Sequence, residues 1–266
     1  MVMVTLSPFD LALAGTLIFI NAGLSLLLRL NIGRQLMVSA LRTVLQLSLL
    51  GFVLKFIFDL VNPGLIALMA FFMITTAGWE VMQRQSYRFS GIWGFGIGTS
   101  AMCLSSFLIT LFALIAIIGK DPWYAPQYAI PLLGMILGNT MTGIAIGLDR
   151  LTQTVWEKKA VIETRLMLGQ KFSEAVSDIR RDSIRSGLIP IINAMSVAGI
   201  VSLPGMMTGQ ILAGAPPMEA VKYQILIMFL IAGGAGFGTI FAVGAGAKRL
   251  SDGRDRLRLD RLGKKK

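Results

Sequence analysis

The sequence of 266 residues contains no histidine and only one cysteine, Cys103. Imidazole is the commonest metal ligand in proteins and the usual proton carrier near neutral pH. This chain has no imidazole side chain for either role. A single cysteine excludes a disulfide within the chain and a cluster of thiolate ligands. The chain is therefore a poor candidate for a zinc, haem or thiolate-metal protein.

The sequence also lacks the pattern Gly-x-x-x-x-Gly-Lys-[Ser/Thr]. That loop holds the phosphates of ATP in many nucleotide hydrolases. A catalytic set, such as paired acids or a nucleophile beside its base, needs clustered polar residues. The acids outside residues 149–186 are scattered. We therefore expect no enzyme activity in this chain, and any ATP hydrolysis must come from a partner.

Charged residues are scarce, at 15%, whereas hydrophobic residues make up 55% of the chain. Soluble domains carry about 25% charged and about 45–50% apolar residues. The apolar residues are gathered in long runs, and these reach the roughly 20 residues that a helix needs to cross a bilayer. The composition predicts an all-α polytopic membrane protein and disfavours a soluble protein with a very large core.

We predict a single transmembrane domain over residues 1–266. The seven expected membrane-spanning helices lie at about 9–30, 41–58, 65–82, 91–118, 130–148, 187–213 and 221–247. A polar segment, residues 149–186, separates the fifth helix from the sixth, and a basic tail, residues 248–266, follows the seventh. The tail is expected to be partly disordered or to lie on anionic lipid.

The basic residues predict the orientation of these helices. If the N-terminus is outside and the C-terminus inside, 22 of the 25 Lys and Arg residues fall on the cytoplasmic side. Seven helices with this orientation satisfy the positive-inside rule at every loop. The net charge of +11 is thereby explained, and we predict no nucleic-acid partner because no nucleic-acid motif is present.

The polar segment is the most unusual part of the chain, because it carries eight basic and six acidic residues with no proline and one glycine, Gly169. Residues 149–168 favour helix and predict an extension of the fifth membrane helix. Gly169 predicts a corner, since glycine adopts the left-handed conformation at a helix end with little strain. Ser173 can then cap a second helix that ends near Arg185.

Apolar residues of this second helix recur at helical spacing. Phe172, Val176 and Ile179 share one face, and the opposite face is charged. Such a helix can simply rest on lipid headgroups. It can also couple the membrane domain to a cytoplasmic motor, and the sequence pattern alone leaves both interpretations open.

Two sets of residues resemble a known family. Glu163 to Gly169, followed by Ser173-Glu174, resembles the acidic-to-glycine cytoplasmic loop of ABC transporter permeases, although Thr164 and Arg165 replace its two alanines and Pro190 lies further on. The stretch from Ile189 to Gly214, with Gly134 to Asn139 and Arg42 to Leu47, resembles the FetB-type permeases. That family is implicated in bacterial iron export and is related to plant aluminium-tolerance permeases, and the similarity covers essentially the whole chain.

This resemblance implies a multi-pass subunit of the bacterial inner membrane. It implies a homodimeric permease that works with two copies of a separate cytosolic ABC ATPase, which binds ATP and Mg²⁺, and no cofactor in this chain. The expected substrate is iron, another metal or a metal complex. The residues expected to couple to the ATPase are Glu163, Gly169, Phe172, Ser173, Glu174, Val176 and Ile179. The alternative function is a standalone channel or secondary transporter, which would show more buried ionisable groups or inverted repeats.

Polar residues and helix breaks inside the membrane are the default candidates for a substrate pathway. They are Arg42, Gln46, Glu80, Asn139, Asn193, Pro204, Gly205, Met206, Met207 and Gln210. Each also has a structural interpretation: ion pairing or snorkelling for the charged residues, helix-to-helix hydrogen bonds for the asparagines. Pro204-Gly205 predicts a break in the sixth helix, and such breaks often build transport sites. Met206 and Met207 offer thioethers that suit Cu(I) better than iron, but methionine is also common core filler.

Overall fold

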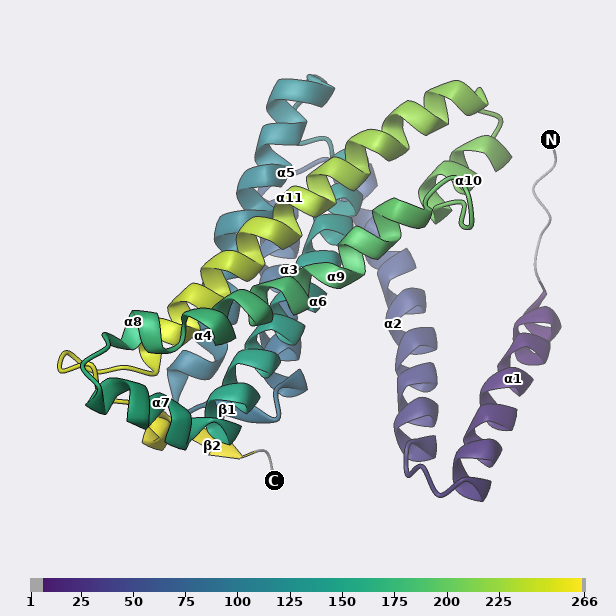
Figure 1. Ribbon diagram of the computed structural model, residues 1–266. Coiled ribbons are helices and arrows are strands. Elements are labelled where there is room, and N and C mark those ends of the chain that lie inside the picture. The colour runs from purple at the N-terminus through teal and green to yellow at the C-terminus, as the bar shows by residue number, and fades with distance from the viewer. Residues whose placement is uncertain (1–6, 265–266) are drawn as a thin grey trace. The chain divides into compact units, whose positions relative to one another are not determined.

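The computed structural model describes residues 7–264 and is mostly helical (Figure 1). The chain forms two compact units. The smaller comprises residues up to 62 with 212–214, and the larger comprises 63–211 with the residues from 215 onward. The expectation of one permease domain stays a prediction.

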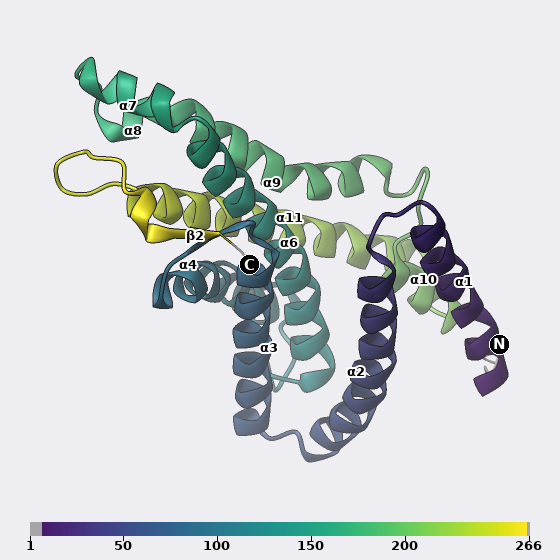
Figure 2. The ribbon, with the colours of Figure 1, turned by 90° about the horizontal axis from the view of Figure 1, so that it is seen from below.

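The smaller unit is a hairpin of two helices, α1 (Pro8–Leu27) and α2 (Gly33–Leu60) (Figures 1 and 2). Ser7 caps α1, and the Asp10 carboxylate accepts a hydrogen bond of 2.8 Å from the Ser7 N–H. The start of α2 fits closely against α1, because a Cβ on Gly33 would lie 3.2 Å from the Ala22 carbonyl oxygen. The helix that contains the second predicted span begins near residue 33, whereas the span itself was predicted to begin near 41.

The larger unit is built around α6 (Pro126–Glu157), which packs against three other long helices. They are α3 (Pro63–Arg84), α9 (Ser177–Val197) and α11 (Pro217–Arg249). The fourth predicted span is one continuous path of α4 (Ile92–Met102), η1 (Cys103–Phe107), α5 (Leu108–Phe112) and η2 (Ala113–Ile118), in which η1 and η2 are π-helical. Figure 2 shows α3 and α6 side by side, with α9 and α11 running across α6.

Among residues 7–264, six stretches of helix are long and apolar enough to cross a membrane: Pro8–Leu27, Gly33–Leu60, Pro63–Arg84, Ile92–Ile118, Pro126–Glu157 and Pro217–Arg249. The chain is thus a polytopic, mostly helical membrane protein, as its composition predicted. The total of seven spans and their orientation stay predictions.

The predicted sixth span, residues 187–213, is not a continuous helix. α9 ends at Val197, residues 198–204 are non-helical, and α10 (Gly205–Leu212) follows. Gly199 has φ +80, and its N–H donates to the Ser202 carbonyl at 2.9 Å, so the chain turns back on itself there. Pro204 disfavours helix in the residue before it. The helix break is therefore longer than predicted. It was expected at Pro204-Gly205, and it begins directly after Val197.

The polar segment confirms the extension and the glycine corner. α6 continues to Glu157, and after Lys158 the helix α7 (Lys159–Met167) carries the chain on. Gly169 has φ +88, its N–H donates to the Leu166 carbonyl, and the Gln170 N–H donates to the Arg165 carbonyl. These two hydrogen bonds form a Schellman motif, which ends the helix.

The second half of the polar segment differs from the prediction. The helix cap is Lys171 rather than Ser173, and the Glu174 carboxylate accepts a hydrogen bond of 3.4 Å from the Lys171 N–H. The turn α8 (Phe172–Ala175) leads at once into α9, which runs without a break from the polar segment to Val197. The predicted helix of residues 173–185 is therefore divided at Val176: its first residues lie in α8, and the rest form the first part of the longer helix α9.

The basic tail is folded as far as Lys264, contrary to the expectation of disorder. Its last strand, β2 (Leu262–Lys264), pairs antiparallel with β1 (Tyr87–Phe89) in the register Phe89 to Leu262. The short helix η3 (Leu259–Arg261) precedes it. Leu257, Leu259 and Leu262 pack against the hydrophobic core, and burial of apolar surface explains why the tail is ordered despite its charge.

Candidate functional site

The predicted coupling residues of α8 and α9 lie in the protein core. Phe172, Val176 and Ile179 are 4%, 2% and 3% exposed. They belong to one hydrophobic cluster with Ile162 of α7 and Leu250 at the start of the tail. These side chains therefore hold the polar segment in shape, and they cannot contact a partner while this core is closed.

The most exposed large apolar side chains of the polar segment lie at the glycine corner. Met167 and Leu168 are 79% and 80% exposed, although both lie outside every helix that could span a membrane. Exposed apolar side chains with polar neighbours are typical of interaction sites. The sequence analysis passed over these two residues, and the signal that could have found them is a pair of large apolar residues directly before the corner.

The polar candidates flank this corner. Glu163, Ser173 and Glu174 are exposed, and Gly169 forms the corner itself. The structure thus brings these four predicted coupling residues to the same end of the unit as Met167 and Leu168, and it separates them from the buried set.

An ion pair braces the two arms of the corner. The guanidinium of Arg165 on α7 donates to both carboxylate oxygens of Asp178 on α9, at 3.0 and 3.1 Å, and to the Ala175 carbonyl at 2.8 Å. The hydrogen bond from Arg165 holds the pKa of the Asp178 carboxyl below its ordinary value. A two-pronged contact of this kind fixes direction as well as distance, so the corner is held in one orientation.

The tail and the α3–α4 connection complete the brace. The Asp255 carboxylate accepts a hydrogen bond of 3.2 Å from the Phe172 N–H. On the other side, Asp149 of α6 accepts one of 2.6 Å from the Ser86 N–H, and the rings of Tyr87 and Trp156 stack at 4.8 Å. In Figure 1 the yellow tail lies beside α7 and α8. The polar end is therefore one connected body.

The pathway candidates within the larger unit lie on different helices and not in one pocket. Glu80 is half-buried on α3, and Asn193 is exposed on α9. Asn139 is exposed on α6, where its amide donates to the Met135 carbonyl one turn away at 2.9 Å. This hydrogen bond is therefore within its own helix. Arg42 and Gln46 lie on α2, in the smaller unit.

The residues around the helix break divide by burial. Met207 is buried, whereas Met206 and Gly205 are exposed. Pro204 is half-buried and accepts a hydrogen bond of 3.1 Å from the Thr208 N–H. The side-chain carbonyl of Gln210 is buried without a hydrogen-bond partner, which leaves it able to accept one from a ligand or a water.

Buried hydroxyl groups are polar features that the sequence analysis missed. Thr140 of α6, Thr239 of α11 and Ser106 of η1 have buried hydroxyl oxygens without a partner. Glycines surround them: a Cβ on Gly238 would lie 2.6 Å from the Thr140 Cγ2 atom. π-helical turns such as η1 are frequent at functional sites. Within residues 7–264, however, no three Cys, Asp or Glu side chains gather as ligands for a metal ion.

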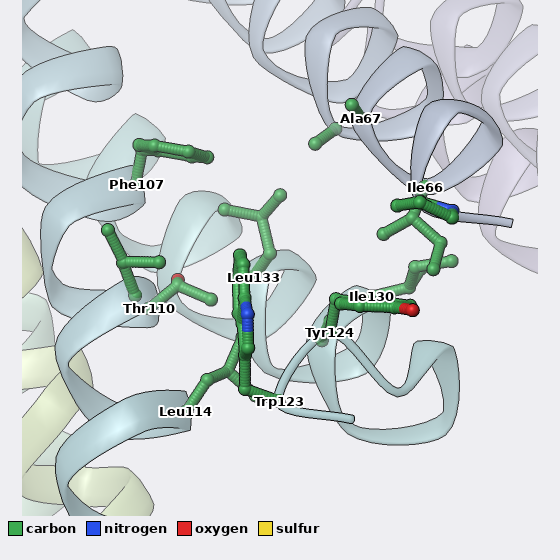
Figure 3. A pocket seen from close by; sticks show the side chains of 13 residues that line it. Ile66, Ala67, Phe107, Thr110, Leu114, Trp123, Tyr124, Ile130 and Leu133 are labelled. Carbon is green, nitrogen blue, oxygen red and sulfur yellow. The ribbon is translucent and has the colours of Figure 1, made fainter. Parts of the chain in front are cut away.

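A pocket lies near the loop of residues 119–125. Its cavity volume is about 150 Å³, and side chains such as Ile66, Phe107, Trp123 and Leu133 line it. Figure 3 shows these side chains around a shared space, with the Tyr124 ring at one side. The lining is almost wholly apolar, so this pocket does not suit a charged solute.

Comparison with known proteins adds the family context. Residues 8–251 match the model of an uncharacterised protein family, UPF0014. A UPF0014 membrane protein of Synechocystis is 43% identical over 206 residues, which is 76% of this chain and 77% of the relative. The probable iron export permease protein FetB of Escherichia coli is 33% identical over 96% of both chains. Protein ALUMINUM SENSITIVE 3 of Arabidopsis thaliana is 34% identical over 77% of this chain and 73% of its own. No solved structure matches the chain.

Proposed function

Because the chain belongs to the UPF0014 family of membrane proteins, we propose that it is the permease subunit of an ABC transporter that exports iron, another metal or a metal complex. In this proposal two copies of the chain form a homodimer and work with two copies of a separate cytosolic ATPase. The similarity to the probable iron export permease FetB covers nearly the full length of both proteins and supports the transport role.

The main observation in favour of an ATPase partner is the exposed corner at Met167 and Leu168. Transport driven by ATP requires that a nucleotide-hydrolysing protein push on the membrane helices, and this sequence has no phosphate-binding loop of its own. The corner offers apolar contact area, and the ion pair between Arg165 and Asp178 fixes the corner to α9. α9 in turn runs directly to the helix break after Val197.

The alternative role for the polar segment, a helix that rests on lipid headgroups, needs a free apolar face. Phe172, Val176 and Ile179 were the candidates for that face, and they are buried against α7 and the tail. Burial of this face favours a protein partner for the exposed corner over insertion into lipid.

The substrate pathway in this proposal uses weak oxygen ligands. No cluster of acidic or cysteine ligands is present in residues 7–264, so a metal would pass loosely held or as a complex. Amide and hydroxyl oxygens that lack partners inside the larger unit, as on Gln210 and Thr140, are the groups we assign to transient contacts. In this proposal the corner faces the cytoplasm, which the positive-inside distribution supports, and the membrane is the bacterial inner membrane that the similarity to FetB implies.

We expect the chain to retain an ABC ATPase during purification. The tagged protein would be co-expressed with the candidate ATPase subunits of the same genome and purified in mild detergent, with an unrelated membrane protein under the same tag as control. One ATPase should co-purify in a ratio near one to one. If none of these ATPases is retained, a channel or a secondary transporter becomes the better interpretation.

We also expect the chain to lower cellular iron. Cells that lack the gene should accumulate more iron than wild-type cells under iron or peroxide stress, because the proposed transport is outward. Total iron, copper and zinc would be measured by mass spectrometry, with the restored gene as control. Unchanged iron together with a rise in another metal would reassign the substrate, and no change in any metal would contradict metal export.

A further inference from the structure

The corner is one wall of a groove, and the tail supplies the other wall. Glu163, Leu166, Met167 and Gln170 line it from α7 and the corner, and residues 254–257 line it from the tail. The open cavity between them has a volume of about 520 Å³. Met167 belongs both to the exposed corner and to this groove, so the two surfaces are continuous.

The tail wall is a tight loop with a fixed shape. The Asp252 carboxylate accepts hydrogen bonds from the Arg254 and Arg256 N–H groups, at 3.0 and 2.9 Å. The hydrogen bond from the Arg256 N–H is the main reason that the pKa of the Asp252 carboxyl is lowered. The Asp255 carboxylate ties the loop to α8 through the Phe172 N–H. A loop that is already ordered loses little entropy when it binds a partner.

Charge distribution distinguishes this loop from a lipid-binding patch. A patch for anionic lipid requires several basic side chains that are available together. Here Arg256 pairs with Asp252 at 3.3 Å, and Arg258 pairs with Asp260 at 2.8 Å. Arg261 donates to two backbone carbonyls at 2.8 Å. Within the loop of residues 252–257, Arg256 is thus paired inside the tail, and Arg254 is the other basic side chain of that loop.

Charged side chains of both signs line the groove, and on the tail wall Asp255 is held by the Phe172 N–H while Arg256 is paired with Asp252. Glu163 lies on the α7 wall, and the exposed Arg254 lies on the tail wall, with the apolar side chains of Leu166 and Met167 in the same lining. Such a groove fits a protein segment with an apolar centre, a basic side chain for Glu163 and an acidic side chain for Arg254.

We propose that the tail loop of residues 252–257 is a second contact for the ATPase subunit, and that Arg254 binds an acidic side chain of that subunit. This inference rests on the proposed function, because it assumes that an ATPase docks at the corner. It extends the docking surface to a part of the chain beyond residue 251, where the match to the family model ends. In this proposal the tail both covers the hydrophobic core and contacts the ATPase.

Photo-crosslinking in membranes tests this inference. A photoreactive phenylalanine analogue would replace Met167, Arg254 or, as a control at the start of α11, the exposed Met218 in the full chain, co-expressed with the ATPase. We expect crosslinks to the ATPase from positions 167 and 254 and none from 218. Crosslinks from 167 without any from 254, or crosslinks from 254 to lipid alone, would overturn the inference and leave the proposed function intact. Absence of ATPase crosslinks at both positions would overturn both.

A charge exchange gives a second, quantitative test. Arg254→Glu should weaken ATPase binding roughly tenfold at low salt, whereas Arg254→Lys should retain most of it, because a charge pair at the edge of an interface depends on sign more than on shape. Binding would be measured by titration of labelled ATPase onto the permease in nanodiscs. Equal affinity for Arg254→Glu and the wild type would contradict a role for this side chain.

Discussion

Aspartate at both Met167 and Leu168 is expected to abolish co-purification of the ATPase while the permease still inserts and folds. Both side chains are about four-fifths exposed, at 79% and 80%, so charge at these positions costs the free permease little. In a docked complex the same carboxylates would be buried without partners. Loss of a central apolar contact typically costs about 2 kcal/mol or more, or roughly 30-fold in affinity.

The matched control exchanges the two residues, Met167→Leu with Leu168→Met, which keeps apolar area at the corner and should keep the complex. Permease yield, elution volume and melting temperature should be similar in all three proteins, and the ATPase retained per permease should differ. Phe172 is unsuitable for this test because it is only 4% exposed, so its loss would disturb the core and the corner together. A full complement of ATPase on the aspartate variant would contradict docking at the corner.

Gly187→Ala is expected to lower the stability of the larger unit strongly. A Cβ at this position would lie 2.5 Å from the Gly143 carbonyl oxygen and 2.7 Å from the Thr239 Cγ2 atom. The first of these is backbone, which cannot rotate aside, so α9 would have to move away from α6. Overpacking of a tight core costs about 1–3 kcal/mol, which for a chain of this size is a fall of several degrees in melting temperature.

Gly138→Ala is the matched control, since it lies on α6 and a Cβ there would meet no atom within 4 Å. Its melting temperature in detergent should equal that of the wild type or exceed it slightly, because alanine favours helix. Melting would be followed by the loss of the monodisperse peak on heating. Similar melting temperatures for the two variants would contradict the close crossing of α6, α9 and α11.

The glycine corner shows how far local patterns predict this structure. Gly169 follows a helix-favouring stretch, and the left-handed conformation that ends a helix is a property of a few neighbouring residues. The prediction therefore needed no knowledge of the rest of the chain. The apolar spacing of Phe172, Val176 and Ile179 likewise predicted a shared face, and the structure confirms that they lie together.

What covers that face could not be predicted. The cover comes from α7 and from the tail, whose Leu250 and Leu262 lie more than 70 residues further along the chain. The tail's net positive charge suggested disorder or lipid binding, yet its leucines are buried and its strand pairs with Tyr87–Phe89. Pairing between such distant strands has no local sequence signature, because register depends on how the intervening helices pack.

The sequence by itself determined the membrane class of this protein, the absence of a phosphate-binding loop and the corner at Gly169, because each depends on composition or on residues close together. Only the tertiary structure decided that Met167 and Leu168 are the most exposed large apolar residues of the polar segment and that Phe172, Val176 and Ile179 are buried. Periodicity places a residue on a face of its helix. Whether that face meets a partner or the chain's own core is set by contacts between distant segments.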